Sequence, residues 1–245
     1  MLRKNRWFYS LVILMLLFAV PRIMAEAPQL TILFTHDLHD HLQPFTVLDN
    51  EGLIRTVGGY ARIQSLIQKI QKLDPELVLV DAGDFSMGTL FQTIFASHAP
   101  QLRLMGKMGY DAITFGNHEF DFRALGLADS LTAAKNSNDP LPPITVANIN
   151  FPKDQAGNLT PSLGKLKEAM NNYPIEDYII IERKGVRIGI FGLMGKDSAS
   201  NAPMAEVEFT DPVTKARSVV EKLKVEQVDL ILCLSHSGTG GVSPN

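Results

Sequence analysis

Short apolar strands alternate with amphipathic helices along most of the chain, and this alternation limits the possible folds more than any other feature. The sequence predicts strands at residues 30–35, 77–80, 112–115, 144–149 and 228–234, and helices at 61–73, 101–108, 125–136 and from Pro212 onward. Two further apolar runs, 178–182 and 186–193, flank Lys184-Gly185 and predict a hairpin. Strand followed by helix, repeated several times, is typical of an α/β fold in which helices cover a partly parallel sheet.

One stretch interrupts the alternation. Residues 151–176 contain three prolines and two glycines among polar side chains, and they predict a polar loop on the surface. The chain shows no internal repeat and no low-complexity segment. At 245 residues it therefore has the length of one large domain or two small ones.

The composition excludes several classes of protein. With 45% hydrophobic and 20% charged residues, the chain is close to the average for globular proteins, which argues against a disordered tail, a coiled coil or a polytopic membrane protein. The single cysteine, Cys233, excludes a disulfide framework and a cysteine-rich zinc site. It lies inside an apolar run, so we expect a buried core residue. The formal net charge of −3 gives no general attraction for nucleic acid.

The first 25 residues predict a secretory signal peptide. Arg3, Lys4 and Arg6 precede an apolar stretch, and Ala25 offers a small residue for cleavage. The apolar stretch is short for a membrane span, which needs about 20 residues, although an uncleaved N-terminal anchor is an alternative. We therefore expect export to the periplasm, the cell surface or the medium, with no stable membrane insertion after cleavage. Residues 26–245 would then carry 19 basic against 26 acidic side chains, a net charge of −7.

Polar side chains gather where the predicted strands end. In open α/β sheets, ligands bind outside the carboxyl ends of the strands, so these side chains are expected to meet at one rim. The run Gly-Asn-His-Glu-Phe-Asp at 116–121 is the most unusual of them, because a solvated loop has little reason for it. The side chains that four strands would bring to this rim are Asp37, His39, Asp84, Asn117, His118 and His236.

This set of side chains suits two divalent metal ions. Imidazole with carboxylate or amide oxygen favours Zn, Mn or Fe. One aspartate can bridge two ions, and such a pair clamps the attacking and leaving oxygens of an in-line displacement. A histidine nearby that binds no metal could stabilise the leaving group. Each motif alone is a weak signal, since polar residues after strands are common, but their occurrence together and in order is far more specific.

The same motifs resemble the calcineurin-like metallophosphoesterase superfamily. The flanking runs narrow the resemblance to the secreted 5′-nucleotidase and 2′,3′-cyclic phosphodiesterase family: Thr-His-Asp-Leu-His-Asp-His at 35–41, Gly-Gly-Tyr-Ala-Arg at 58–62, Asp-Ala-Gly-Asp at 81–84 and Ala-Asn-Ile at 147–149. The resemblance covers residue 30 to the last residue. It implies a β-sandwich flanked by helices.

The resemblance also implies roles for single residues. Asp37 and His39 match ligands of a first metal, Asp84 matches a bridging carboxylate, and Asn117 and His236 match ligands of a second metal. His118 matches the catalytic histidine that contacts the phosphoryl group, and Asp121 matches the carboxylate that orients it. The residues agree, because Asp121 lies three positions after His118 and could accept its ring N–H. No substrate-binding residue can be assigned.

The chain also departs from the family pattern. His36 and Asp40 stand where Asn and Gly are usual, and Arg123 lies close to a position where Gly is frequent. The family places a further Gly-His-x-His or Gly-His-x-Gln motif roughly 30–40 residues beyond the position of His236, whereas this chain stops at Asn245. We therefore expect residues 26–245 to be a catalytic domain truncated before its last metal ligands, without the nucleoside-binding domain that follows in the family.

The expected function is hydrolysis of nucleotide phosphate esters of the 5′-nucleotidase type, with a dinuclear metal centre and metal-bound hydroxide as nucleophile. The expected partner is a nucleotide or another small phosphate ester, and the oligomeric state stays open. One alternative is a related enzyme that acts on cyclic nucleotides, sugar nucleotides or a sulfur ester. Another is an inactive, truncated metal-binding module. A mononuclear zinc hydrolase is disfavoured because the chain has no His-Glu-x-x-His helix.

Overall fold

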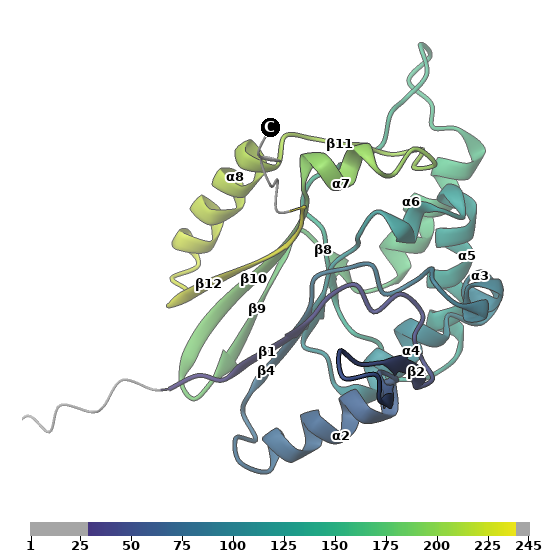
Figure 1. Ribbon diagram of the computed structural model, residues 1–245. Coiled ribbons are helices and arrows are strands. Elements are labelled where there is room, and N and C mark those ends of the chain that lie inside the picture. Colours follow the sequence, from purple (N-terminus) through teal and green to yellow (C-terminus); the bar gives the residue numbers. More distant parts are fainter. Residues whose placement is uncertain (1–28, 239–245) are drawn as a thin grey trace, which may run out of the picture.

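Two β-sheets packed face to face, with helices on both outer sides, form the framework of the domain (Figure 1). The computed structural model describes residues 29–238, and the predicted signal peptide lies outside these residues. Among the described residues, no helix is both long enough and apolar enough to cross a membrane. The predicted class, a β-sandwich flanked by helices, is confirmed.

The first sheet contains five strands, all parallel, in the order β1-β4-β5-β6-β8. Its strands are β1 (Ile32–Thr35), β4 (Val78–Asp81), β5 (Ala112–Ile113), β6 (Ile144–Thr145) and β8 (Ile175–Glu176). Every residue of β4 is buried, as expected for a central strand that is covered on both faces. Because all five strands run in one direction, their carboxyl ends lie along the same edge.

Helices cover the outer face of this sheet (Figure 1). They are α2 (Tyr60–Gln71), α3 (Phe95–His98), α4 (Pro100–Met108), α5 (Arg123–Asn136) and α6 (Pro161–Asn172). The largest cluster of buried side chains fills the space between these helices and the sheet, and it includes Phe85, Phe95, Phe115 and Phe120. Phe85, Phe115 and Phe120 belong to segments that connect strands to helices, so their burial in this core fixes the position of these segments.

The second sheet contains three strands, in the order β12-β10-β9. β9 (Tyr178–Arg183) and β10 (Val186–Met194) form the predicted antiparallel hairpin, and β12 (Leu230–His236) runs parallel to β10. Val78, Val80, Ile188, Ile190 and Leu234 fill the space between the two sheets. α8 (Pro212–Val225) begins at the predicted Pro212 and covers the other face of this sheet. Asp211 caps it, since its carboxylate accepts a hydrogen bond from the backbone N–H of Thr214.

The prediction of a surface loop over 151–176 is wrong. Residues 161–172 form α6, whose Leu163 and Leu166 are buried in the main core, and residues 175–176 form β8 of the first sheet. Thr160 caps α6, since its hydroxyl accepts a hydrogen bond from the N–H of Leu163. Pro161 occupies the first turn, where its missing N–H costs nothing. Pro161, one of the residues on which the loop prediction rests, is therefore part of the signal that starts the helix.

Two other expectations need correction. Cys233 is exposed, not buried, because it lies on β12, an edge strand of the second sheet. The single strand predicted at 144–149 is divided between β6 and a short strand β7 (Ile149–Asn150), which pairs with β11 (Glu208–Phe209). Asn148 lies at this division, and its buried amide donates hydrogen bonds to the carbonyls of Met194 and Thr210. These contacts draw the chain away from the first sheet.

The remaining elements are short. β2 (Phe45–Leu48) and β3 (Ile54–Val57) form a hairpin that the sequence analysis did not predict. The one-turn helices are η1 (Leu90–Ile94), η2 (His118–Phe120) and α7 (Lys196–Ser200). Of these, η2 and α7 contribute side chains to the site.

Candidate metal centre

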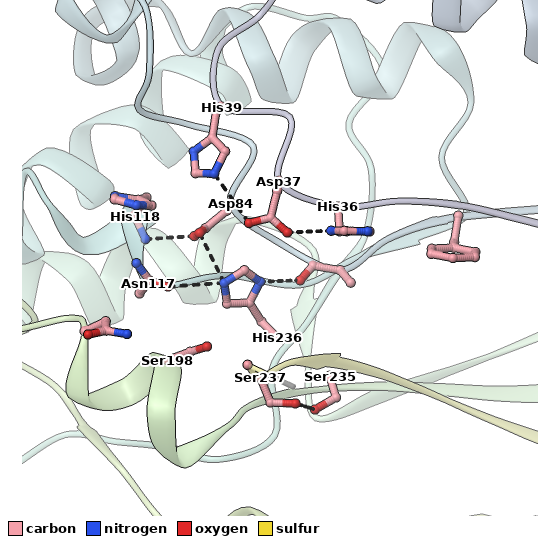
Figure 2. A pocket seen from close by; sticks show the side chains of 14 residues that line it. His36, Asp37, His39, Asp84, Asn117, His118, Ser198, Ser235, His236 and Ser237 are labelled. Carbon is pink, nitrogen blue, oxygen red and sulfur yellow. Dashed lines mark hydrogen bonds and ion pairs between the residues drawn. The ribbon is translucent and has the colours of Figure 1, made fainter. Parts of the chain in front are cut away.

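The polar residues predicted at the strand ends line one pocket of about 720 Å³ (Figure 2). Asp37 and His39 follow β1, Asp84 follows β4, Asn117 and His118 follow β5, and His236 is the last residue of β12. The pocket therefore lies where the carboxyl ends of strands from both sheets meet, as expected for an α/β fold. Asp121, the seventh predicted residue, is absent from the pocket lining and lies behind His118.

Asp37 and His39 lie on the loop after β1, which runs alongside the loop after β4. The backbone N–H of Asp37 donates to Gly83 O at 2.9 Å, and that of His39 donates to Asp84 O at 3.0 Å. Both residues have positive φ angles, 52° and 44°, which turn their side chains toward the pocket. His39 Nδ1 lies 3.0 Å from the carbonyl of Met87. A carbonyl only accepts, so this nitrogen carries a hydrogen, and Nε2 lies 3.4 Å from Asp37 Oδ1.

Asp84 is the buried centre of the group. Its Oδ1 accepts a hydrogen bond from the backbone N–H of His118 at 2.9 Å, and its Oδ2 lies 3.2 Å from His236 Nε2. Burial disfavours the charged form, but the hydrogen bonds from His236 and His118 and the charges of both rings outweigh it and lower the pKa of Asp84. Asp84 is therefore a carboxylate with one oxygen directed at each half of the site.

His236 and Asn117 lie on the other side of Asp84. His236 Nδ1 donates to the carbonyl of Ala82 at 2.8 Å, so Nε2 points at Asp84 and at Asn117 Oδ1, 3.2 Å away. Burial works against a charged ring, yet the hydrogen bond and charge of Asp84 raise the pKa of His236 to about 9. The carboxylates thus create a site for positive charge, which a divalent cation would satisfy after His236 releases its proton.

His118 is oriented from behind. Its Nδ1 lies 2.6 Å from Asp121 Oδ2, which leaves Nε2 free to face the pocket. Burial lowers the pKa of His118, but the hydrogen bond to Asp121 and the negative charges of Asp84, Asp121 and Glu119 more than compensate and raise it. A protonated ring at this position can donate a hydrogen bond or a proton to an anionic ligand.

The donor atoms are close enough together to hold metal ions. Asp37, Asp84 and His236 form one set of possible ligands, and His39, Asp84 and His118 form another; within each set the ligand atoms lie within 4.8 Å of one another. Both sets contain Asp84, so one carboxylate is placed to serve two ions. Carboxylate and neutral imidazole suit Zn or Mn, and the Nδ1 hydrogen bonds of His39 and His236 fix the ring orientations that ligation needs.

Other residues around the site were not predicted. Ser198 and Asn201 line the pocket from the side of α7, opposite the carboxylates. Glu119 is fully buried beneath the site, and burial together with the charge of Asp84 raises its pKa to about 7. Glu119 stands inside the run 116–121, but the sequence alone does not show that its side chain points into the protein.

The two departures near the first metal ligands have different structural roles. His36 is exposed, and its Nδ1 lies 2.5 Å from Asp37 Oδ2. Asp40 has a φ of 56°, a conformation that favours glycine and that aspartate tolerates better than most residues. Its carboxylate is fully buried and accepts a hydrogen bond from the Gln101 amide. His36 thus contacts Asp37 at the surface of the site, whereas Asp40 acts in the interior.

Comparison with known proteins identifies the family to which the chain is similar. Residues 30–244 match the family described as calcineurin-like phosphoesterase. The chain is 33% identical over 215 residues to a 5′-nucleotidase of Bos taurus, a match that covers 86% of this chain and 34% of that protein. It is 31% identical to a probable 5′-nucleotidase of Treponema pallidum, covering 86% of this chain and 33% of the relative. The chain thus spans about a third of the length of these relatives.

Solved structures give the same result. The fold superposes on the 5′-nucleotidase precursor of Thermus thermophilus with a TM-score of 0.67 and 31% identity, covering 86% of this chain and 38% of that structure. An NAD nucleotidase of Haemophilus influenzae superposes with a TM-score of 0.68 and 26% identity, covering 87% of this chain and 39% of that structure.

Proposed function

The chain belongs to the calcineurin-like phosphoesterase family, and from this membership we propose that it hydrolyses phosphate esters of nucleotides at a centre of two divalent metal ions. The observation that carries the proposal is the position of Asp84. It is buried, it is charged, and it belongs to both sets of possible metal ligands. A carboxylate in this position is what two neighbouring ions require.

In this proposal Asp37 and His39 would hold the first ion, Asn117 and His236 the second, and Asp84 would serve both; the division follows the family resemblance, since by distance alone Asp37 groups with His236 and His39 with His118. The distances of 3.2 Å from His236 Nε2 to Asp84 Oδ2 and to Asn117 Oδ1 support the second group. The distance of 3.4 Å from His39 Nε2 to Asp37 Oδ1 supports the first. His118 could also reach the first group, but its hydrogen bond to Asp121 and its raised pKa favour a protonated ring that binds no metal.

The metal pair, when bound, supplies positive charge for the phosphoryl oxygens and makes hydroxide available near neutral pH. The chain's own residues complete the chemistry. His118 donates a hydrogen bond from Nε2 to the phosphoryl group, which stabilises the negative charge that develops there. Asp121 holds the ring in this orientation through Nδ1. Ser198 and Asn201 close the opposite wall of the pocket and limit where the ester group can lie.

The proposed substrates are nucleoside 5′-monophosphates, because the relatives that match most of this chain are named 5′-nucleotidases. These relatives are about three times as long as the matched region. Export of the chain to the periplasm or beyond is proposed from the predicted signal peptide alone.

Metal analysis and a phosphate-release assay test the proposal together. The 245-residue chain is loaded with Mn²⁺ or Zn²⁺, and release of inorganic phosphate is measured with adenosine 5′-monophosphate, a 2′,3′-cyclic nucleotide and a sugar nucleotide. We expect two bound ions per chain, with the 5′-monophosphate as the best substrate. Preference for one of the other esters would replace the proposed substrate with that of a related enzyme. Two bound ions without turnover of any ester would support a metal-binding module instead.

A further inference from the structure

The buried carboxylate of Glu119 joins the two loops that carry the proposed metal ligands. Its Oε2 accepts hydrogen bonds from the backbone N–H groups of Asp84, at 3.0 Å, and Gly116, at 2.6 Å. Its Oε1 accepts from the backbone N–H and the hydroxyl of Ser86, at 3.0 and 2.8 Å. One side chain thus receives four hydrogen bonds, from a loop after β4 and a loop after β5.

The two loops touch directly at the same place. A Cβ atom added to Gly116 would lie 2.1 Å from Asp84 Oδ1, so only glycine allows this approach. The backbone N–H of His118 donates to the same oxygen. The carboxylate of Asp84 is therefore positioned from one side by the loop after β5, while Glu119 holds its backbone from below.

No contact assigns Glu119 to the chemistry itself. It is absent from the pocket lining and its exposed fraction is 0%. A buried carboxylate carries a large desolvation cost that four hydrogen bonds to it offset, and an ordinary core residue would avoid that cost. The presence of a carboxylate at this buried position is therefore best explained by the four hydrogen bonds that it accepts.

We infer that Glu119 is a positioning residue that sets the distance between the Asp84 carboxylate and the loop that carries the proposed ligand Asn117 and the catalytic candidate His118. The expected effect on metal binding rests on the proposed function. The four hydrogen bonds to the Glu119 carboxylate, which we call the Glu119 clamp, are present in the metal-free chain. Substitution of Glu119 should loosen both loops together and weaken binding of the second ion, because Asp84 and Asn117 would no longer be held in one geometry.

Two substitutions distinguish the effect of the four hydrogen bonds from the effect of the negative charge on Glu119. Glu119→Gln keeps the length of the side chain, but its NH₂ group must face at least one backbone N–H, so the four hydrogen bonds cannot all form. Glu119→Asp keeps the charge but is one methylene shorter, so it cannot reach both loops. Leu166 lies on the buried face of α6, away from the site, so Leu166→Ala provides a control that lowers the stability of the domain without touching the site.

Hydrogen exchange of the metal-free chain gives the first measurement. In both Glu119 variants the amides of Asp84, Ser86 and Gly116 should exchange at least tenfold faster than in the wild type. In Leu166→Ala, compared at a temperature equally far below its unfolding midpoint, these three amides should keep their wild-type rates. Unchanged exchange in Glu119→Gln, or equal acceleration in Leu166→Ala, would overturn the inference. Wild-type exchange rates in Glu119→Asp would also overturn the inference, because a negative charge without the full side-chain length would then be enough to protect these amides.

Mn²⁺ titration followed by electron paramagnetic resonance gives the second measurement. The dissociation constant of the more weakly bound ion should rise at least tenfold in both Glu119 variants and stay within threefold of the wild type in Leu166→Ala. Failure of the wild type to hydrolyse any phosphate ester would count against the proposed function, whereas the exchange rates in the metal-free chain decide the role of Glu119 independently.

Discussion

His118 faces two carboxylates with different roles. Asp121 contacts its Nδ1, and Asp84 accepts a hydrogen bond from its backbone N–H, so the ring and the main chain are fixed separately. The ring can therefore be removed without moving the backbone that supports Asp84. This separation makes His118 the best single residue for distinguishing chemistry from metal binding.

We predict that His118→Ala lowers kcat for phosphate release by about 10²–10⁴-fold, the usual loss for a general acid or hydrogen-bond donor. Because its ring is not a proposed ligand, the variant should retain both metal ions, as measured by elemental analysis after gel filtration. Asp121→Asn is the matched variant and should give a smaller loss of kcat, since the ring stays but loses its charged partner. Equal losses of metal and activity in His118→Ala would instead assign His118 to the metal.

A buried carboxyl outside the proposed ligand set, Asp81, leads to a prediction about pH. It accepts hydrogen bonds from the Thr35 hydroxyl and the Gly83 N–H, but burial outweighs them and raises its pKa from the ordinary 3.8 to about 8. Between these values the folded chain keeps a proton that the unfolded chain has released. The free energy of unfolding should therefore decrease as the pH rises from about 4 to about 8.

Asp81→Asn removes this proton and should flatten the pH dependence, with the variant gaining stability over the wild type as the pH approaches 8. Urea unfolding of the metal-free proteins at several pH values measures the difference. His236, whose pKa is raised from 6.5 to about 9, loses its stabilising effect between those values; it is present in both chains, so the difference between them below pH 6.5 reports on Asp81. A difference that does not change with pH would contradict the assignment.

At the level of elements, the two sheets approach most closely where β10 passes β6. The N–H of Ala147 donates to Gly192 O at 2.9 Å, and a Cβ on Gly192 would lie 2.0 Å from Thr145 O. A backbone carbonyl cannot move aside as a flexible side chain can. The strand β10 therefore needs glycine here to stay in contact with the first sheet.

We predict that Gly192→Ala destabilises the domain by about 1–3 kcal/mol, the range for overpacking a rigid core. The control is Gly164→Ala in α6, where an added Cβ meets nothing within 4 Å. That substitution should stabilise by about 0.5–1 kcal/mol, because alanine is the better helix former. Thermal unfolding of both variants measures the opposite signs. An unchanged or raised unfolding midpoint in Gly192→Ala would contradict the predicted contact with Thr145 O.

On the scale of the whole molecule, the proposed ligands come from both sheets. Asp37, Asp84 and Asn117 follow strands of the first sheet, whereas His236 ends β12 of the second. Metal bound between them would therefore link the two halves of the sandwich, and its binding free energy would add to the free energy of unfolding.

We predict that Mn²⁺ at 100 times its dissociation constant stabilises the chain by about 2.7 kcal/mol for each ion that binds only the folded state. Excess chelator should reverse the gain in the unfolding midpoint. His236→Ala should lose the part that comes from the second ion and keep the part from the first. An unfolding midpoint that Mn²⁺ leaves unchanged would count against a metal centre between the sheets.

The fold could be predicted well where the local pattern and the tertiary environment agree. The fully buried β4, the β9–β10 hairpin and the Asp211-Pro212 start of α8 all carry strong local signals. The prediction for 151–176 is wrong because Pro161 and Gly164 disrupt a helix in general, whereas here Pro161 lies at a helix start and α6 packs against α5. The prediction for Cys233 is wrong because an apolar strand does not reveal whether it lies at the edge of a sheet.

The candidate chemistry follows from the linear order of residues, because imidazole, carboxylate and amide groups placed directly after strands are expected at the carboxyl ends of an α/β fold, whereas the meeting of His236 with the residues of the first sheet depends on how the two sheets pack. Asp37, His39, Asp84, Asn117, His118 and His236 could therefore be named before any coordinates were known. The residues that hold them in place could not. Glu119, Asp81 and Asp40 matter through burial and through hydrogen bonds to distant parts of the chain, and only the packed structure creates those surroundings.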